Sequence, residues 1–230
     1  MRSKGLQQKE LLNTVVRTSI KIKYLLYLPK NYNSRGSSFP LIVFLHGAGE
    51  RGGNLDHLKK HGIAKNLETA KKFPFVVVSP QCPEDKWWTG NVDTLKVLID
   101  NIKSTYNIDS SRVYLTGLSM GGFGTWALAA KYPDDFAAIA PICGGGEVWL
   151  AATGRYNMPI WAFHGAKDNV IPITRSQEMV DVIKAAGGNV RFTVYPKLEH
   201  NCWEKAYKNK NLYKWFLKYK KIAKKTAEIE

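Results

Sequence analysis

The sequence predicts an α/β protein whose mostly parallel, doubly wound sheet is covered by helices on both faces. Strand-like runs alternate with helical periodicities along the chain, and several of these runs are continuously apolar, as in parallel strands buried on both faces. The chain has 230 residues, 44% of them hydrophobic, which suffices for a sizeable core. We therefore expect one domain spanning residues 1–230, without linkers or internal repeats.

Seven short runs carry the strand signal. They lie at residues 20–28, 41–45, 75–78, 113–115, 137–140, 160–163 and 190–194. In a doubly wound sheet, functional sites form beyond the carboxyl ends of the strands. The segments that follow these runs are therefore where we expect the chemistry.

Helical periodicity appears at three main places between and after the strand-like runs. The first apolar stripe comprises Val92, Leu95, Ile99, Ile102 and Tyr106. The second comprises Met179, Val180, Ile183 and Ala186, and two glycines then end that helix. The last helix is expected to bury Leu212, Trp215, Phe216, Tyr219 and Ile222.

The chain is strongly basic, with a formal net charge of +15. Nine lysines and three glutamates in residues 201–230 supply +6 of this charge, and the remaining +9 is spread over two hundred residues. No basic and aromatic pattern of the usual nucleic-acid modules is present. We expect a solvated basic surface and no nucleic-acid partner.

The cysteines and the absence of targeting signals limit which kinds of site and location the sequence predicts. Cys82, Cys143 and Cys202 form no C-x-x-C pair, so no metal site is expected, although one disulfide with a free thiol stays open. The N-terminus lacks an apolar signal core, and no apolar run reaches membrane-spanning length. We expect no membrane association; the protein is secreted if a leader was removed and cytoplasmic otherwise.

A glycine-flanked serine gives the clearest catalytic signal. Gly117-Leu-Ser119-Met-Gly121 runs from a strand signal into a helix, which is the context that supports a G-x-S-x-G nucleophile turn. Such a turn is tight, so the residues two positions before and after the serine must be small. Ser119 is therefore the candidate nucleophile.

A serine nucleophile needs a base and an acid that orients it, in the chain order acid and then histidine. His200 lies in the loop before the last helix, whereas His164 lies inside a strand end, so we expect His200 to be the base. Asp168 follows the 160–163 strand and is the expected acid, with a turn or capping role as the alternative. This triad requires no metal or organic cofactor.

Backbone N–H groups complete the expected site. The glycine-rich segment after the 41–45 strand predicts Ala48 as one oxyanion donor, and Met120 after the serine is the other. His46, just before this turn, is expected to have a structural hydrogen-bonding role. His57 and His61 are interpreted as surface residues because no third metal ligand accompanies them.

These motifs together resemble the compact α/β-hydrolase serine esterases. The resemblance rests on His46-Gly-Ala-Gly-Glu-Arg-Gly52, Gly117–Gly122, His164-Gly-Ala-Lys-Asp168 and Glu199-His200, and covers most of the chain. The family group comprises phospholipases and carboxylesterases and the prolyl-oligopeptidase-like "predicted peptidase" proteins, close to the feruloyl and acetylxylan esterases of carbohydrate esterase family one. It implies an α/β-hydrolase fold, the triad Ser119, Asp168 and His200, and Ala48 and Met120 as oxyanion donors.

The short connection after Pro141 leaves no room for a cap domain. An open nucleophile suits short-chain or aromatic acyl esters, including feruloyl or acetyl esters of plant polysaccharide. Trp87, Trp88 and Trp203 are the candidate substrate-binding residues, with a core role as the alternative for each. A serine peptidase and a non-catalytic binding module are the rival functions.

Overall fold

The computed structural model describes residues 11–33 and 35–221, and its centre is a seven-stranded sheet in the order β1-β3-β2-β4-β5-β6-β7. Only β1 is antiparallel to its neighbour, β3. The strands are β1 (Tyr24–Tyr27), β2 (Phe39–Leu45), β3 (Val76–Pro80), β4 (Ile108–Leu118), β5 (Ala138–Ile142), β6 (Ile160–Gly165) and β7 (Val190–Tyr195). The expected α/β-hydrolase fold, with its mostly parallel sheet, is therefore confirmed.

Seven α-helices in the described residues connect these strands. They are α1 (Gly62–Leu67), α2 (Val92–Thr105), α3 (Met120–Lys131), α4 (Val148–Ala152), α5 (Thr174–Ala185), α6 (Trp203–Lys208) and α7 (Lys210–Phe216). Short 3₁₀ turns include η1 (Ala48–Glu50), η3 (Trp88–Gly90) and η5 (His200–Cys202). None of the described helices has the length and hydropathy of a membrane span.

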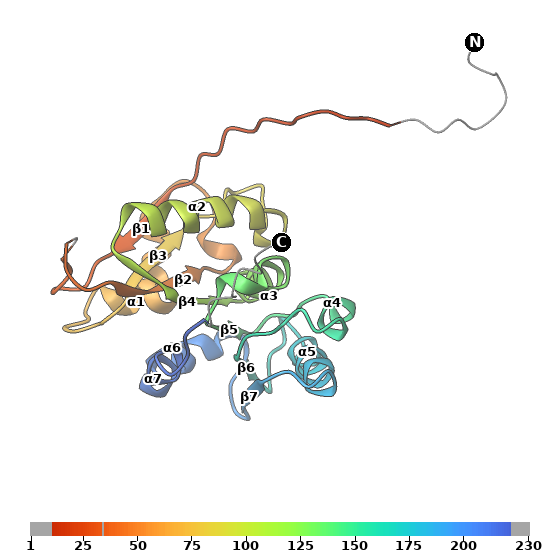
Figure 1. Cartoon of the computed structure of the whole chain (residues 1–230). Helices are drawn as coiled ribbons and strands as arrows, with labels where there is room; N and C mark the ends of the chain where they lie inside the picture. Colours follow the sequence, from red (N-terminus) through yellow and green to blue (C-terminus); the bar gives the residue numbers. More distant parts are fainter. Residues whose placement is uncertain (1–10, 34, 222–230) are drawn as a thin grey trace, which may run out of the picture.

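The side-chain alternation of β2 shows why both faces of the sheet are covered. Leu41, Val43 and Leu45 face a core built with α2, α3 and α5, whereas Ile42 and Phe44 face a second core built with α1, α6 and α7. All five side chains are almost fully buried. Because successive residues of a strand point to opposite faces, one apolar run fills two cores. The helices that contribute to these cores can be followed in Figure 1.

The predicted last helix is wrong in its extent. Asn209 has an extended backbone, and its side chain accepts a hydrogen bond from Asn211 N at 3.0 Å. This cap begins α7, which carries Leu212, Trp215 and Phe216 of the predicted stripe but ends at Phe216. Tyr219 lies beyond that end, and Ile222 lies outside the described residues.

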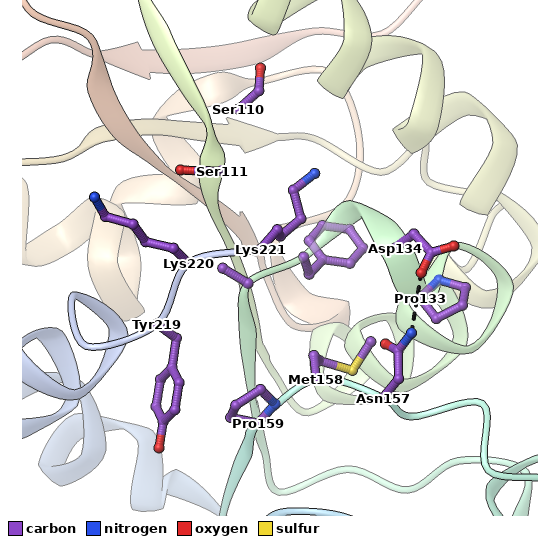
Figure 2. Close-up of a pocket in the computed structure, with 12 residues that line it drawn as sticks. Ser110, Ser111, Pro133, Asp134, Asn157, Met158, Pro159, Tyr219, Lys220 and Lys221 are labelled. Carbon is purple, nitrogen blue, oxygen red and sulfur yellow. Dashed lines mark hydrogen bonds between the residues drawn. The ribbon is translucent and has the colours of Figure 1, made fainter. Parts of the chain in front are cut away.

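A cavity of about 720 Å³ lies near the starts of β4, β5 and β6, where the strands enter the sheet. Figure 2 shows Tyr219, Lys220 and Lys221 on one side and Asn157 bonded to Asp134 on the other. The glycine-flanked serine follows the other end of β4. This cavity is therefore at the edge of the sheet opposite to the expected chemistry.

His46 joins the end of β2 to the segment after β3. Its Nε2 accepts a hydrogen bond from Cys82 N at 2.9 Å, and its backbone oxygen accepts one from Trp88 Nε1 at 3.0 Å. The ring is 1% exposed, and burial lowers its pKa from 6.5 to about 4. The expected structural hydrogen-bonding role of His46 is confirmed.

The low pKa of His46 predicts a stability loss in mild acid. Between pH 6.5 and 4 the unfolded chain takes up a proton that the folded protein refuses, so stability falls as the pH falls. From pH 7 to 4.5 we expect a loss of about 2 to 3 kcal/mol from this group. The measurement is urea unfolding at both pH values, with His46→Gln as the control that retains an acceptor but cannot titrate. An equal loss in both proteins would contradict the prediction.

Candidate active site

Ser119 sits on a strained turn between β4 and α3. Its backbone has φ 52° and ψ −118°, and its N–H donates to Ile142 O at 3.0 Å. A Cβ at Gly117 would collide with Gly121 O, and one at Gly121 would collide with Leu45 O. The predicted need for small residues on both sides of the serine is confirmed, because three backbone segments meet there.

The structure brings Ser119, His200 and Asp168 into one hydrogen-bonded chain. His200 Nε2 lies 2.9 Å from Ser119 Oγ, and His200 Nδ1 lies 2.7 Å from Asp168 Oδ2. The His200 side chain is 16% exposed and that of Asp168 is fully buried. With the proton on Nδ1 donated to the carboxylate, Nε2 is free to accept the serine proton.

The Asp168 carboxylate is held from both oxygens. Oδ1 accepts hydrogen bonds from Val170 N at 2.9 Å and from Ile171 N at 2.8 Å. Oδ2 faces His200. One oxygen of Asp168 thus closes the loop after β6, as the turn alternative predicts, and the other lies against His200, so its role as the orienting acid stays a prediction.

His164 is a second histidine at this carboxylate, and the sequence interpretation did not assign it a role there. Its side chain is fully buried at the end of β6, with Nε2 3.1 Å from Asp168 Oδ2 and 2.9 Å from Ile171 O. Both of these neighbours are acceptors, so the proton lies on Nε2. The i, i+4 spacing of His164 and Asp168 was the signal in the sequence.

Burial lowers the pKa of His164, which favours the neutral ring. Its Nδ1 is then an acceptor for the Ser176 hydroxyl, 2.8 Å away. The same hydroxyl lies 2.7 Å from Gly144 O and donates to one of the two at a time. The acid is therefore supported by a buried polar chain that reaches α5.

The loop after β2 passes directly beside the serine. A Cβ at Gly47 would lie 3.7 Å from Ser119 Cβ and 2.8 Å from Leu118 Cδ1. Ala48 is the first residue of η1 and Met120 the first of α3, and N–H groups in a first helical turn have no partner within the helix. The predicted oxyanion donor Ala48 thus begins η1, and Met120 begins α3 directly after Ser119. Their role as oxyanion donors stays a prediction.

The three tryptophans predicted to bind substrate differ in their exposure and contacts. Trp87 is 52% exposed, with the Arg51 guanidinium 5.4 Å from its ring centre. Trp203 packs edge-on against the His200 ring, with centroids 5.2 Å apart. Both remain candidates for contact with substrate.

Trp88 requires a correction. Its side chain is 0% exposed, its ring packs edge-on against His46, and a Cβ at Gly124 would lie 2.5 Å from Trp88 Cβ. A fully buried indole cannot form the wall of an open cleft. Trp88 instead packs against His46, which directly follows β2. We therefore remove Trp88 from the candidate substrate-binding residues.

His61 lies near two carboxylates that the sequence interpretation did not connect to it. Its Nε2 is 3.8 Å from Glu50 Oε1 and its Nδ1 is 3.7 Å from Glu204 Oε1, while 41% of its side chain is exposed. Glu50 is 5% exposed, and burial raises its pKa. Its Oε2 would lie 3.2 Å from a Cβ at Gly47, so a buried carboxyl lies against the loop beside Ser119.

Three potential metal ligands also meet here. The ligand atoms of Cys143, Asp168 and His200 lie within 4.8 Å of one another. Burial raises the pKa of the Cys143 thiol well above its ordinary value, and the thiolate is the form that binds metals. The raised pKa of Cys143 therefore disfavours metal binding by these three residues.

The three cysteines are all free and buried: Cys82, Cys143 and Cys202. The disulfide that the sequence left open is therefore not formed.

The site is uncapped in the described chain. The connection from β5 to β6 contains only one short helix, α4 (Val148–Ala152). Ser119 is partly exposed, as is His200. The short connection predicted from the sequence is confirmed.

Comparison with known proteins identifies the family. The model of the dienelactone hydrolase family matches residues 84–228. The bifunctional acetylxylan esterase/xylanase XynS20E of Neocallimastix patriciarum is 34% identical over 151 residues, which are 63% of this chain and 21% of that protein. The probable feruloyl esterase C of Aspergillus flavus is 27% identical over 188 residues, 79% of this chain and 67% of that protein.

A solved structure extends the likeness to three dimensions. The crystal structure of a thermostable esterase superposes with a TM-score of 0.73 at 33% identity, covering 88% of this chain and 60% of that one. The chain thus spans about a fifth of the bifunctional enzyme and three fifths of the thermostable esterase.

The contact between His164 and Asp168 predicts an effect on catalysis. His164→Leu removes an N–H donor from Asp168, so more negative charge faces His200 and favours its protonated form. We expect kcat to fall about tenfold and the acid limb of kcat/KM to move to higher pH, since a hydrogen bond to a charged group is worth about 1.5 to 3 kcal/mol. The measurement is the pH profile of p-nitrophenyl acetate hydrolysis.

The matched control is His164→Gln, whose amide N–H can occupy the position of Nε2. It should retain most of the activity and the wild-type acid limb. If His164→Leu lowers only the melting temperature and leaves kcat and the limb unchanged, His164 is a packing residue and the prediction is wrong.

Proposed function

This chain belongs to the dienelactone hydrolase family and is homologous to feruloyl and acetylxylan esterases, and we propose that it is a serine esterase that forms an acyl-enzyme on Ser119. The observation that carries the proposal is the hydrogen-bonded chain from Ser119 through His200 to Asp168. A serine hydroxyl is a weak nucleophile without such a base. In this proposal His200 is that base, and Asp168 is the group that orients it.

The proposed reaction has two steps. His200 Nε2 takes the proton of Ser119 as Oγ attacks the ester carbonyl carbon, and the protonated His200 then gives that proton to the leaving alcohol. Water, activated by His200, hydrolyses the acyl-enzyme and releases the acid. The N–H groups of Ala48 and Met120 stabilise the oxyanion in both steps, while Asp168 keeps His200 in the required tautomer.

The substrates that we propose are short-chain or aromatic acyl esters, in particular acetyl or feruloyl esters of plant polysaccharide. The short connection through α4 leaves Ser119 accessible to a polymer. Exposed Trp87 offers a flat apolar face for an aromatic acyl group or a sugar ring, and half-buried Trp203 packs beside His200. The feruloyl and acetylxylan esterases among the relatives support this choice.

Replacing the nucleophile tests the reaction type. Ser119→Ala should lower kcat for p-nitrophenyl acetate by about a million-fold and abolish labelling by a fluorophosphonate probe, because the acyl-enzyme cannot form. Ser104→Ala on the exposed side of α2 is the matched control and should label normally. A Ser119→Ala protein that kept a tenth of the activity would rule out Ser119 as the nucleophile.

The open site predicts a preference for small acyl groups. Each methylene contributes up to about 0.8 kcal/mol only when it leaves water, and an uncapped cleft buries few of them. Activity on p-nitrophenyl esters should therefore be highest from acetate to butyrate and fall steeply by octanoate. Highest activity at decanoate, or activation at an oil–water interface, would contradict the open cleft.

The aromatic platform is tested in the same assay series. Trp87→Ala should raise KM for methyl ferulate more than KM for p-nitrophenyl acetate, because only the ferulate ring is large enough to stack on the indole. The acetate ester is the internal control. An equal change in both KM values would show that Trp87 does not select the acyl group.

A further inference from the structure

A groove runs away from the serine along helix α3. It is a cavity of about 460 Å³ whose near end includes Phe123 and Gly145 and whose far end includes Lys131 and Arg155. Phe123 N donates to Ser119 O at 3.1 Å, so the near end lies one helical turn from the serine. From Phe123 to Lys131 the helix rises about 12 Å, at about 1.5 Å per residue.

The floor of the α3 groove is apolar. Phe123 and Ala127 of α3 face it, together with Leu150 of α4 and Tyr156 from the connection to β6. Residues of all three elements line this one cavity, and Figure 1 shows α3 and α4 in the ribbon. Such a floor suits the apolar faces of sugar rings, which need flat contact area.

The rim of the groove carries two arginines that are available for a ligand. Arg155 makes no ion pair with any residue in the described part of the chain, and Arg175 has one, to Glu178 at 3.6 Å, with both side chains about half exposed. Exposed pairs of this kind contribute little. Glu147 is the acid on the same rim, and Lys131 is held by Asp93 at 2.6 Å.

Arg175 also has a defined place relative to the triad. A Cβ at Gly145 would lie 3.2 Å from Arg175 Nε, so this side chain lies across the glycine loop after β5. The hydroxyl of the next residue, Ser176, lies 2.7 Å from Gly144 O and 2.8 Å from Nδ1 of His164, which contacts Asp168. The near arginine is therefore tied to the polar chain that supports the acid.

We propose that the α3 groove binds the polysaccharide part of the substrate and selects chains whose sugars carry carboxylate groups. The planar guanidinium of arginine accepts a carboxylate with two parallel hydrogen bonds, which favours arginine over lysine for this recognition. Arg175 meets a carboxylate near the ester, and Arg155 meets one farther along the groove. This inference rests on the proposed esterase function and adds the class of polymer.

Binding without turnover tests the groove separately from catalysis. The ligands are trigalacturonate and neutral xylotriose, titrated into the Ser119→Ala protein by calorimetry at low salt. We expect trigalacturonate to bind at least about tenfold more tightly, and the preference to shrink as salt screens the arginines. Equal affinity for the two trisaccharides would overturn the proposal, whatever the esterase assays show.

A matched pair of double variants separates the groove from the general basic surface. Arg155→Gln with Arg175→Gln should remove the preference for trigalacturonate, whereas Lys208→Gln with Lys214→Gln removes the same charge on α6 and α7 and should keep it. An equal loss in both double variants would show that the whole basic surface binds the anion, and would overturn the proposal.

Folding of the arginine variant is checked by its melting temperature, and a third double variant guards against a structural effect. Arg155→Lys with Arg175→Lys keeps the charge but not the two-point geometry, so it should retain part of the preference.

A failure of Ser119→Ala to abolish ester hydrolysis would refute the proposed reaction and leave the measured preference for acidic chains standing.

Discussion

The crowding of backbone around the β4–α3 turn is the constraint on which the rest of the site depends. Gly117 and Gly121 contact backbone oxygens so closely that neither position has space for a Cβ. Ser119 therefore takes a positive φ, a conformation that an L residue keeps only where its surroundings enforce it. The enforcement comes from the neighbouring strands, through Leu45 O and the bond from Ser119 N to Ile142 O.

The same crowding explains why the loops on either side are so closely tied to the sheet. His46 connects the end of β2 to the backbone after β3, and its buried neutral ring is part of the platform under the loop that carries Ala48. On the other side, Asp168 receives two backbone N–H groups and two histidine rings. Buried polar networks of this kind hold one geometry because each group left unpaired would be costly.

The positive charges of this protein include two arginines on the rim of the α3 groove, which differ from the general basic surface. The net charge of +15 arises from 34 lysines and arginines against 19 acidic residues, and exposed ion pairs contribute little to stability. The two arginines differ from the general basic surface because they line an apolar groove whose near end lies one helical turn from the proposed nucleophile. A charge on the rim of a substrate groove can select the substrate as well as attract it.

Much of the fold and of the candidate site was predictable because the signals are local. The strand periods, the glycines around Ser119 and the acid-then-histidine order each depend on a few adjacent residues, and the described structure contains the corresponding strands and the hydrogen-bonded trio. Chain order, together with the position of His164 inside a strand end, separated His200 from His164 as the candidate base. The oxyanion donors were placed by the same reasoning, from the segment after β2 and the start of α3.

What only the tertiary structure decided depends on contacts between segments distant in the chain. A tryptophan pair such as Trp87 and Trp88 carries no local signal for which ring is buried; packing against His46 and Gly124 buries the second. Likewise, α7 ends at Phe216 although the apolar stripe continues to Tyr219, and the contact between His164 and Asp168 forms when the loop after β6 folds back on the strand end. The sequence by itself determined which residues are chemically competent, while the packing of the sheet decided which of them meet, because distance in space is set by long-range contacts that no local pattern encodes.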